Sequence, residues 1–226
     1  CYEKLGLKEA EKAFQKVIDN YPEQSEEVKA AREKLSLILK AQSVIGTGDK
    51  ELRIRQVWSG PDASSAGKPS PDGKYLSFID QSTGNLGIRE IATGKKITVI
   101  NKGPWEKSYE FAVNSCWSPD GRKLAYAWYN KENFLELRII GVDGSNARTL
   151  YQKKNEWAFP AAWSPDGKSI VAYLIRDYYT SYSNGLISVE DGSLRILKTV
   201  KLLKTAPRNM IFSPDGRYVV VDLPQK

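Results

Sequence analysis

The chain has 226 residues, of which 41% are hydrophobic and 27% are charged, and its formal net charge at pH 7 is +7. Its apolar runs fall short of the roughly 20 residues that a membrane-spanning helix needs, so we expect no transmembrane segment. The chain contains no histidine, which excludes a Ser-His-Asp site and a histidine-ligated metal within it.

The positive charge is concentrated after the first 42 residues. Residues 1–42 hold eight basic and eight acidic side chains, whereas the remainder holds 26 basic and 19 acidic ones. Such an excess suits nucleic acid, an anionic membrane surface or an acidic protein partner, or is simply a solvated surface. No nucleic-acid-binding signature accompanies it, so we expect no specific nucleic-acid partner.

Residues 1–42 predict a hairpin of two amphipathic helices. Apolar residues at helical spacing predict a helix over residues 8–21, which Pro22 ends. Ser25 can cap a second helix, over residues 25–42, whose charges lie on the face opposite its apolar residues.

This hairpin resembles a tetratricopeptide repeat. Ala10, Phe14, Val17 and Pro22 have the spacing of the second helix of that repeat, although the step from Gly6 to Ala10 is one residue short. An unrelated helical hairpin is the alternative. A single repeat cannot bury its own apolar face, so the resemblance implies further repeats before residue 1 in a longer protein.

Residues 43–50 contain two glycines between a helical and a strand pattern, which predicts a linker there. Alternation over residues 51–58 then predicts a strand, the outer strand of a further sheet.

The tetrapeptide Ser-Pro-Asp-Gly recurs four times in the rest of the chain, and its proline recurs at steps of 48, 46 and 49 residues. Proline, aspartate and glycine are the residues of a tight turn between two strands. In each complete unit, one strand-like run precedes the motif and two follow it. A second turn, which ends in glycine, comes next, and a fourth strand-like run follows that turn. We name the predicted strands a to d in each unit: a over 67–69, 113–117, 161–163 and 210–212; b over 75–79, 124–128, 170–174 and 218–221; c over 86–91, 135–140 and 186–189; d over 96–100, 148–150 and 194–197.

Four-stranded antiparallel units of about 47 residues predict a β-propeller. The fold class is therefore mainly β, with about 3.5 blades over residues 51–226 that we expect to be part of a six- to eight-bladed ring, and a short N-terminal helical hairpin. The pattern resembles the WD-repeat-like blades of the TolB type, with Trp117 and Trp163 at the aromatic position before the motif, Phe212 nearly so, and Pro69 departing from it. The TolB family has an α/β domain before its propeller, where this chain has a helical hairpin.

The aspartates of the four motifs tempt interpretation as metal ligands, but each occupies a turn position that favours aspartate, so we expect no metal site and no cofactor. The irregular connections at the other end of the strands are better candidates, because function concentrates on variable loops of a rigid scaffold. Aromatic and basic residues in these connections form the predicted partner-binding site: Trp105, Lys107, Tyr109, Tyr129, Lys131, Arg176, Tyr178, Tyr179 and Arg208. We expect about half of the loop aromatics to pack between blades instead, Trp157 and Tyr129 first.

The predicted function is a non-enzymatic interaction scaffold that binds an acidic or extended protein or peptide partner. The resemblance to TolB implies a bacterial, periplasmic setting and an envelope assembly. The alternative is the substrate-gating propeller of a prolyl-oligopeptidase-like serine peptidase. Because this chain has neither a nucleophile elbow nor a histidine, the catalytic domain would then lie outside it.

Overall fold

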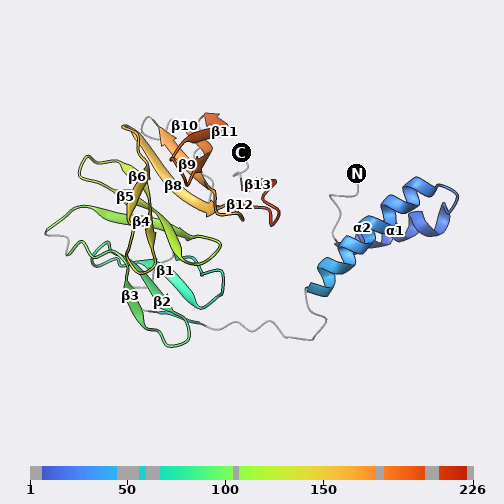
Figure 1. Ribbon diagram of the computed structural model, residues 1–226, viewed down its shortest axis with the longest axis horizontal. Coiled ribbons are helices and arrows are strands. Elements are labelled where there is room, and N and C mark those ends of the chain that lie inside the picture. Colours follow the sequence, from blue (N-terminus) through green and yellow to red (C-terminus); the bar gives the residue numbers. More distant parts are fainter. Residues whose placement is uncertain are drawn as a thin grey trace. The chain divides into compact units, whose positions relative to one another are not determined.

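The computed structural model describes residues 7–44, 56–59, 67–103, 107–176, 181–201 and 209–222. Two compact units make up the chain, Cys1–Arg55 and Gln56–Lys226 (Figure 1).

The first unit contains a helical hairpin of α1 (Leu7–Asn20) and α2 (Ser25–Val44). The carbonyl of Gln24 accepts the first hydrogen bond of α2, from the Val28 amide at 2.9 Å. The cap therefore lies one residue before the predicted Ser25. Among the side chains described in this unit, Ala31 is buried, while the apolar residues around it stay half-buried. Among its described side chains, the hairpin therefore buries little apolar surface completely.

The second unit is a mainly β structure, as predicted. Its described residues form antiparallel sheets in which each strand pairs with its neighbour in the chain (Figure 1). The sheets are blade 1, with β1 (Tyr75–Ile79), β2 (Leu86–Glu90) and β3 (Lys96–Thr98); blade 2, with β4 (Phe111–Trp117), β5 (Lys123–Tyr129), β6 (Leu135–Gly141) and β7 (Arg148–Tyr151); blade 3, with β8 (Glu156–Trp163), β9 (Ser169–Arg176), β10 (Ser181–Ser188) and β11 (Leu194–Lys201); and blade 4, with β12 (Met210–Phe212) and β13 (Val219–Val221).

Successive blades pack side by side, since β4 of blade 2 lies beside β1 of blade 1 and β8 of blade 3. Strand β8 also lies beside β6 of blade 2 and β12 of blade 4. This arrangement is that of a β-propeller, and it confirms the predicted fold class. The total blade number of the ring stays a prediction.

Blade 1 departs from the predicted pattern at two places. Its a strand, expected over residues 67–69, is reduced to a single bridge between Pro69 and Leu76, because proline lacks the amide that a ladder needs. The strand predicted over 51–58 is absent from residues 56–58, the part of it that the structure describes. Instead, the Trp58 ring packs edge-on against Phe78, with ring centroids 5.0 Å apart.

Blade 3 is longer than predicted. Strand β8 begins at Glu156 rather than at residue 161, and β10 begins at Ser181 rather than at residue 186. Much of the irregular connection expected over 176–184 is therefore strand, and Tyr182 is buried in it. The ladder continues past Pro160 because the register shifts there, which accommodates a residue without an amide hydrogen.

The apolar core lies between blades rather than within one. One buried cluster joins blade 1 residues such as Leu86 to blade 2 residues such as Tyr126, and a second joins Leu137 of blade 2 to Leu174 of blade 3. The middle strands β5 and β9 are accordingly buried on both faces.

The four Ser-Pro-Asp-Gly turns repeat one hydrogen-bond pattern. In each copy the serine hydroxyl donates to the aspartate Oδ1 at 2.6 Å, and the same oxygen accepts the amide two residues later at 3.0 to 3.1 Å. Each glycine has a positive φ between 68° and 71°, which favours glycine. The structural role predicted for these aspartates is confirmed.

The tryptophan before the motif links neighbouring blades. The Trp117 indole donates to the Lys68 carbonyl at 2.8 Å, and the Trp163 indole donates to the Cys116 carbonyl at 3.3 Å. Because Lys68 and Cys116 are one repeat apart, the two bonds are equivalent. Phe212 fills the aromatic position of blade 4, and its ring has no N–H group that could donate such a bond.

Candidate functional site

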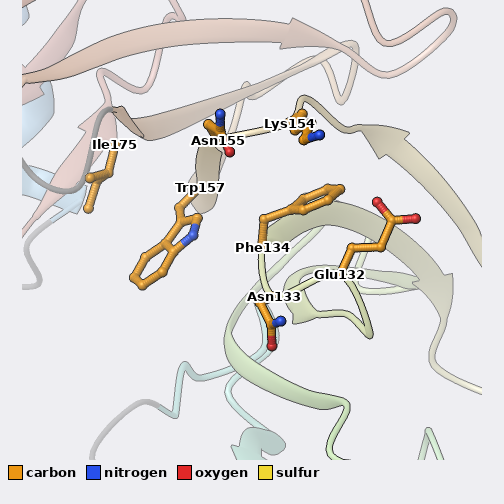
Figure 2. Close-up of a pocket in the computed structure, with 7 residues that line it drawn as sticks. All are labelled: Glu132, Asn133, Phe134, Lys154, Asn155, Trp157 and Ile175. Atoms are coloured by element: carbon orange, nitrogen blue, oxygen red, sulfur yellow. The ribbon is translucent and has the colours of Figure 1, made fainter.

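The connections between blades 2 and 3 enclose a pocket. We call the end of the strands that carries the β5–β6, β7–β8 and β9–β10 connections the loop face, and the end with the Ser-Pro-Asp-Gly turns the turn face. The pocket lies on the loop face and has a volume of about 460 Å³. We call it the rim pocket, and its lining residues are Glu132, Asn133, Phe134, Lys154, Asn155, Trp157 and Ile175 (Figure 2).

Two asparagines with left-handed backbone shape the walls of the rim pocket. Asn133 in the β5–β6 connection has φ 64°, and Asn155 in the β7–β8 connection has φ 61°. Asparagine is one of the few non-glycine residues that adopts this conformation readily. Asn130 closes the first loop, because its Oδ1 accepts the amides of Glu132 at 2.9 Å and Phe134 at 3.3 Å. Each chain reversal therefore has a local cause in the sequence.

The interior of the rim pocket is apolar and its mouth is charged. Phe134 is buried, and Trp157 and Ile175 are half-buried. Figure 2 shows the Phe134 and Trp157 side chains side by side along the pocket, with Ile175 beyond Trp157. Lys154 and Glu132, both exposed, lie at the Phe134 side (Figure 2). This arrangement can hold an apolar side chain while the mouth contacts polar backbone or charge.

A buried carboxylate anchors the rim next to Trp157. Glu156 is 1% exposed, and its Oε1 accepts the Tyr151 hydroxyl at 2.5 Å. Its Oε2 accepts Nε of Arg176 and lies 4.0 Å from Nζ of Lys153. Burial, followed by the hydrogen bond to Glu156, raises the pKa of Tyr151, so its hydroxyl stays a donor. The network ties the start of β8 to the ends of β7 and β9.

A second buried carboxylate supports the β5–β6 side. Glu136 accepts Nδ2 of Asn130 at 2.6 Å, Nε of Arg138 at 2.7 Å and the Thr149 hydroxyl at 3.0 Å. Burial alone would raise the pKa of Glu136, but the hydrogen bonds from Arg138, Asn130 and Thr149 outweigh it and lower the pKa. The Arg138 guanidinium lies 5.3 Å from the centroid of the Trp128 ring. Charge-assisted hydrogen bonds to Glu136 thus hold the loop that carries Phe134 in place.

Three of the predicted partner-binding residues border the rim pocket. The Tyr129 ring stacks on Phe111, 4.9 Å between centroids, within its own blade. Its hydroxyl donates to Asn133 Oδ1 at 3.1 Å. Lys131 is exposed beside the pocket, and the Arg176 guanidinium is engaged by Glu156. Arg176 therefore holds the rim in place.

Two other predicted residues, Lys107 and Tyr109, lie in the β3–β4 connection and are exposed, Tyr109 at 83%. The remaining predicted residues, Trp105, Tyr178, Tyr179 and Arg208, lie outside the described residues. The predicted site as a whole stays a prediction.

The sequence reasoning did not select the residues that form the pocket walls, above all Phe134, Asn133, Asn155 and Ile175. Phe134 is the last residue of the connection predicted over 129–134, and Ile175 lies between the strand predicted over 170–174 and the connection predicted from residue 176. The sequence feature that indicates these residues is a pair of asparagines, Asn133 and Asn155. Each lies in a short connection, one or two residues before the next strand begins.

Among the described residues, no group of three or more histidine, cysteine, aspartate or glutamate side chains is placed to hold a metal ion. Helices long and apolar enough to cross a membrane are likewise absent from the described part. Burial raises the pKa of the Cys116 thiol to about 12, so this thiol stays protonated.

Comparison with known proteins gives no matching family model. A segment of the chain is 31% identical over 89 residues to the uncharacterized peptidase YuxL of Bacillus subtilis, and the match covers 36% of this chain and 13% of that protein. The chain therefore spans a small part of that relative.

Solved structures with a similar fold include two TolB proteins. The putative TolB from Agrobacterium tumefaciens has a TM-score of 0.58 at 25% identity, over 75% of this chain and 57% of that one. TolB from Acinetobacter baumannii has a TM-score of 0.56 at 20% identity, over 72% and 38% of the two chains. Dipeptidyl peptidase 4 of Porphyromonas gingivalis has a TM-score of 0.50 at 12% identity, over 66% and 28%.

Proposed function

Because the second unit is a TolB-like β-propeller, we propose that the chain is a non-enzymatic scaffold whose loop face binds an extended segment of a protein or peptide partner. The rim pocket carries this proposal. It combines a preformed apolar interior of about 460 Å³ with a charged mouth, between loops that buried carboxylates hold in place. Such preorganisation lowers the entropic cost of binding.

The chemistry of the rim indicates the kind of segment. One apolar or aromatic side chain of the partner fills the space beside Phe134 and Trp157, as an anchor residue does at a protein interface. Exposed lysines outnumber exposed acidic side chains at the described loop-face ends of the strands: Lys107, Lys131, Lys153 and Lys154 stand against Glu132 and Asp222. The anchor is therefore flanked by acidic residues in the partner.

The setting is part of the same proposal. A chain that joins a TolB-like propeller to a helical hairpin, whose described apolar side chains are mostly half-buried, suits an assembly protein of the bacterial envelope, on the extracytoplasmic side of the membrane. Both units then contribute binding surface.

A selection experiment tests the loop-face proposal. A phage-displayed library of 12-residue peptides is selected on the chain, and the dissociation constants of the enriched peptides are measured by fluorescence anisotropy. We expect enriched peptides to carry an aromatic or large aliphatic residue near acidic ones. Phe134→Ala and Lys154→Ala should each weaken binding by about tenfold, since a hot-spot residue contributes more than about 1 kcal/mol.

The matched control is Tyr218→Ala, which removes a ring that is 64% exposed just after a turn of the turn face. Peptides that bind Phe134→Ala and Lys154→Ala as tightly as they bind the unchanged chain would contradict the proposal. Lys107→Ala, one connection away from the pocket, shows how far the contact extends.

A second candidate function is the substrate-gating propeller of a serine peptidase. The sequence match to the Bacillus subtilis peptidase favours it. A fluorophosphonate probe, applied to the protein isolated from its source cells, discriminates the two functions. Covalent labelling of a serine would support the gating function, and a chain that stays unlabelled while it binds peptides would support the scaffold.

A further inference from the structure

The turn face carries a concave basic site on blade 2, away from the rim pocket. The hollow has a volume of about 570 Å³ between the β4–β5 and β6–β7 turns. We call it the basic hollow and define it by its charged and polar lining residues: Arg122, Lys123, Asp143, Ser145, Asn146 and Arg148. All six are exposed, and the remaining lining residues are Ile139, Ile140, Gly141 and Val142.

The basic hollow lies where the repeat is broken. In blades 1 and 3 the last strand begins two residues after the turn glycine, whereas Arg148 begins β7 four residues after Gly144. The longer turn passes through Asn146, which has φ 52°. An extension that a uniform turn does not need, held in a left-handed conformation, is a local departure that the fold itself does not explain.

One of the positive charges of the hollow, that of Lys123, is particular to blade 2 among blades 1 to 3. The place of Lys123 is taken by Tyr75 in blade 1 and by Ser169 in blade 3. Arg148 pairs with Ile139 in the ladder, and its blade 3 equivalent is Arg195, which pairs with Leu186. Arg122 likewise has a basic equivalent in blade 3, Lys168. Three cations therefore line this hollow in blade 2, whereas two stand at the equivalent places of blade 3.

Two of the charged groups are held in place. The Arg148 guanidinium donates through one nitrogen to the Val189 carbonyl of blade 3. The one carboxylate, Asp143, accepts the Ser145 amide at 3.0 Å. Hydrogen bonds from Ser145 lower the pKa of Asp143, so this carboxylate is ionised and offsets one of the three cations.

We propose that the basic hollow binds the phosphate group of a phosphate monoester. A single carboxylate pairs with one guanidinium, whereas three cations around one concavity match the double charge and several oxygens of a phosphate. The volume exceeds that of phosphate alone, which leaves room beside the half-buried Val142 for the organic part of the ligand. Both a soluble ester and the headgroup of a phospholipid present this group.

Calorimetric titration of the full chain with glycerol 3-phosphate at low ionic strength tests the site. Lys123→Gln and Arg148→Gln should each weaken binding by about tenfold, because each removes a charge-assisted contact. Lys168→Gln is the matched control: it is the blade 3 equivalent of Arg122 and lies outside the hollow. Lys123→Gln also protects the test against misfolding, since it changes only an exposed side chain, and its thermal midpoint should equal that of the unchanged chain.

Vesicles of phosphatidylcholine with phosphatidic acid form the second arm. Binding of glycerol 3-phosphate identifies a soluble ester as the ligand class, and binding to the vesicles alone identifies a lipid headgroup; both support the site if Lys123→Gln weakens them. Binding that Lys123→Gln and Arg148→Gln leave unchanged, or that Lys168→Gln weakens equally, would overturn the proposal. So would the absence of binding to both probes at millimolar concentration.

Discussion

The buried Glu156 network gives the sharpest test of how the loop face is held. Glu156→Ala removes a carboxylate that is 1% exposed and leaves Tyr151 and Arg176 without their acceptor. Breaking a fully buried ion pair costs about 3–5 kcal/mol. The Arg176 side chain is 31% exposed, so water partly solvates the guanidinium once its acceptor is removed. We therefore expect a loss of stability at the lower end of this range, about 3 kcal/mol.

That loss of stability predicts a fall of about 6–12 °C in the thermal midpoint of the propeller unit, at about 2–4 °C per kcal/mol for a unit of this size. Tryptophan fluorescence is the assay, because all six tryptophans lie between residues 58 and 163. The signal therefore reports the propeller without the helical hairpin. Glu156→Gln keeps an acceptor for Tyr151 and loses the charge, so we expect a smaller cost of about 1–2 kcal/mol.

Two further variants make the reasoning refutable. Glu132→Ala, an exposed acid at the mouth of the rim pocket, should change stability by less than about 0.5 kcal/mol. Arg176→Met added to Glu156→Ala should cost little more than Glu156→Ala alone, because the two side chains act as one unit. A midpoint lowered by less than 2 °C in Glu156→Ala, or costs of the two substitutions that simply add, would refute the account.

Three other outcomes follow from the contacts. Gly192→Ala should destabilise the propeller by several kcal/mol more than Gly73→Ala, as measured by urea unfolding of the two variants. Both glycines have positive φ, but a Cβ at Gly192 would lie 2.0 Å from the Leu150 carbonyl oxygen, whereas a Cβ at Gly73 would meet no atom within 4 Å. Trp117→Phe should cost about 1–2 kcal/mol in the same assay, through loss of the bond to the Lys68 carbonyl. The lowered pKa of Glu136 means that its contribution is present above the ordinary value of 4.5 and is lost as pH falls through the lower folded value. The acid-side loss of thermal stability should therefore be shallower in Glu136→Gln, and an unchanged slope would contradict this.

The propeller was predictable because each Ser-Pro-Asp-Gly turn is a self-contained structure. The serine, aspartate and glycine hydrogen-bond among themselves and with the next few residues, so four copies set the phase of the strands around them. The b strands, and most of blade 2, begin and end within two residues of the prediction. Where the turn was preceded by Pro69 instead of an aromatic residue, the strand before it failed to form.

The rim pocket was less predictable because long-range contacts create it. The strand predicted in this place begins at residue 161, after Pro160, whereas β8 begins at Glu156, a charged residue whose buried carboxylate accepts a hydrogen bond from Arg176, twenty residues away. Sequence spacing does not reveal such a pairing. The strand topology alone indicates the loop face, whereas the walls of the rim pocket depend on which loops lie together in space.

The two candidate sites have one feature in common, because both lie where one blade of the propeller differs from the others. Uniform positions, such as the four motif aspartates, are fully explained by the turn they build. The rim pocket and the basic hollow instead lie where the connections change length or where a left-handed asparagine enters, at Asn133, Asn146 and Asn155. These are the described non-glycine residues with positive φ, and each lines one of the two sites. In this propeller, then, backbone conformations that the repeat does not need mark both places where chemistry outside the fold is expected.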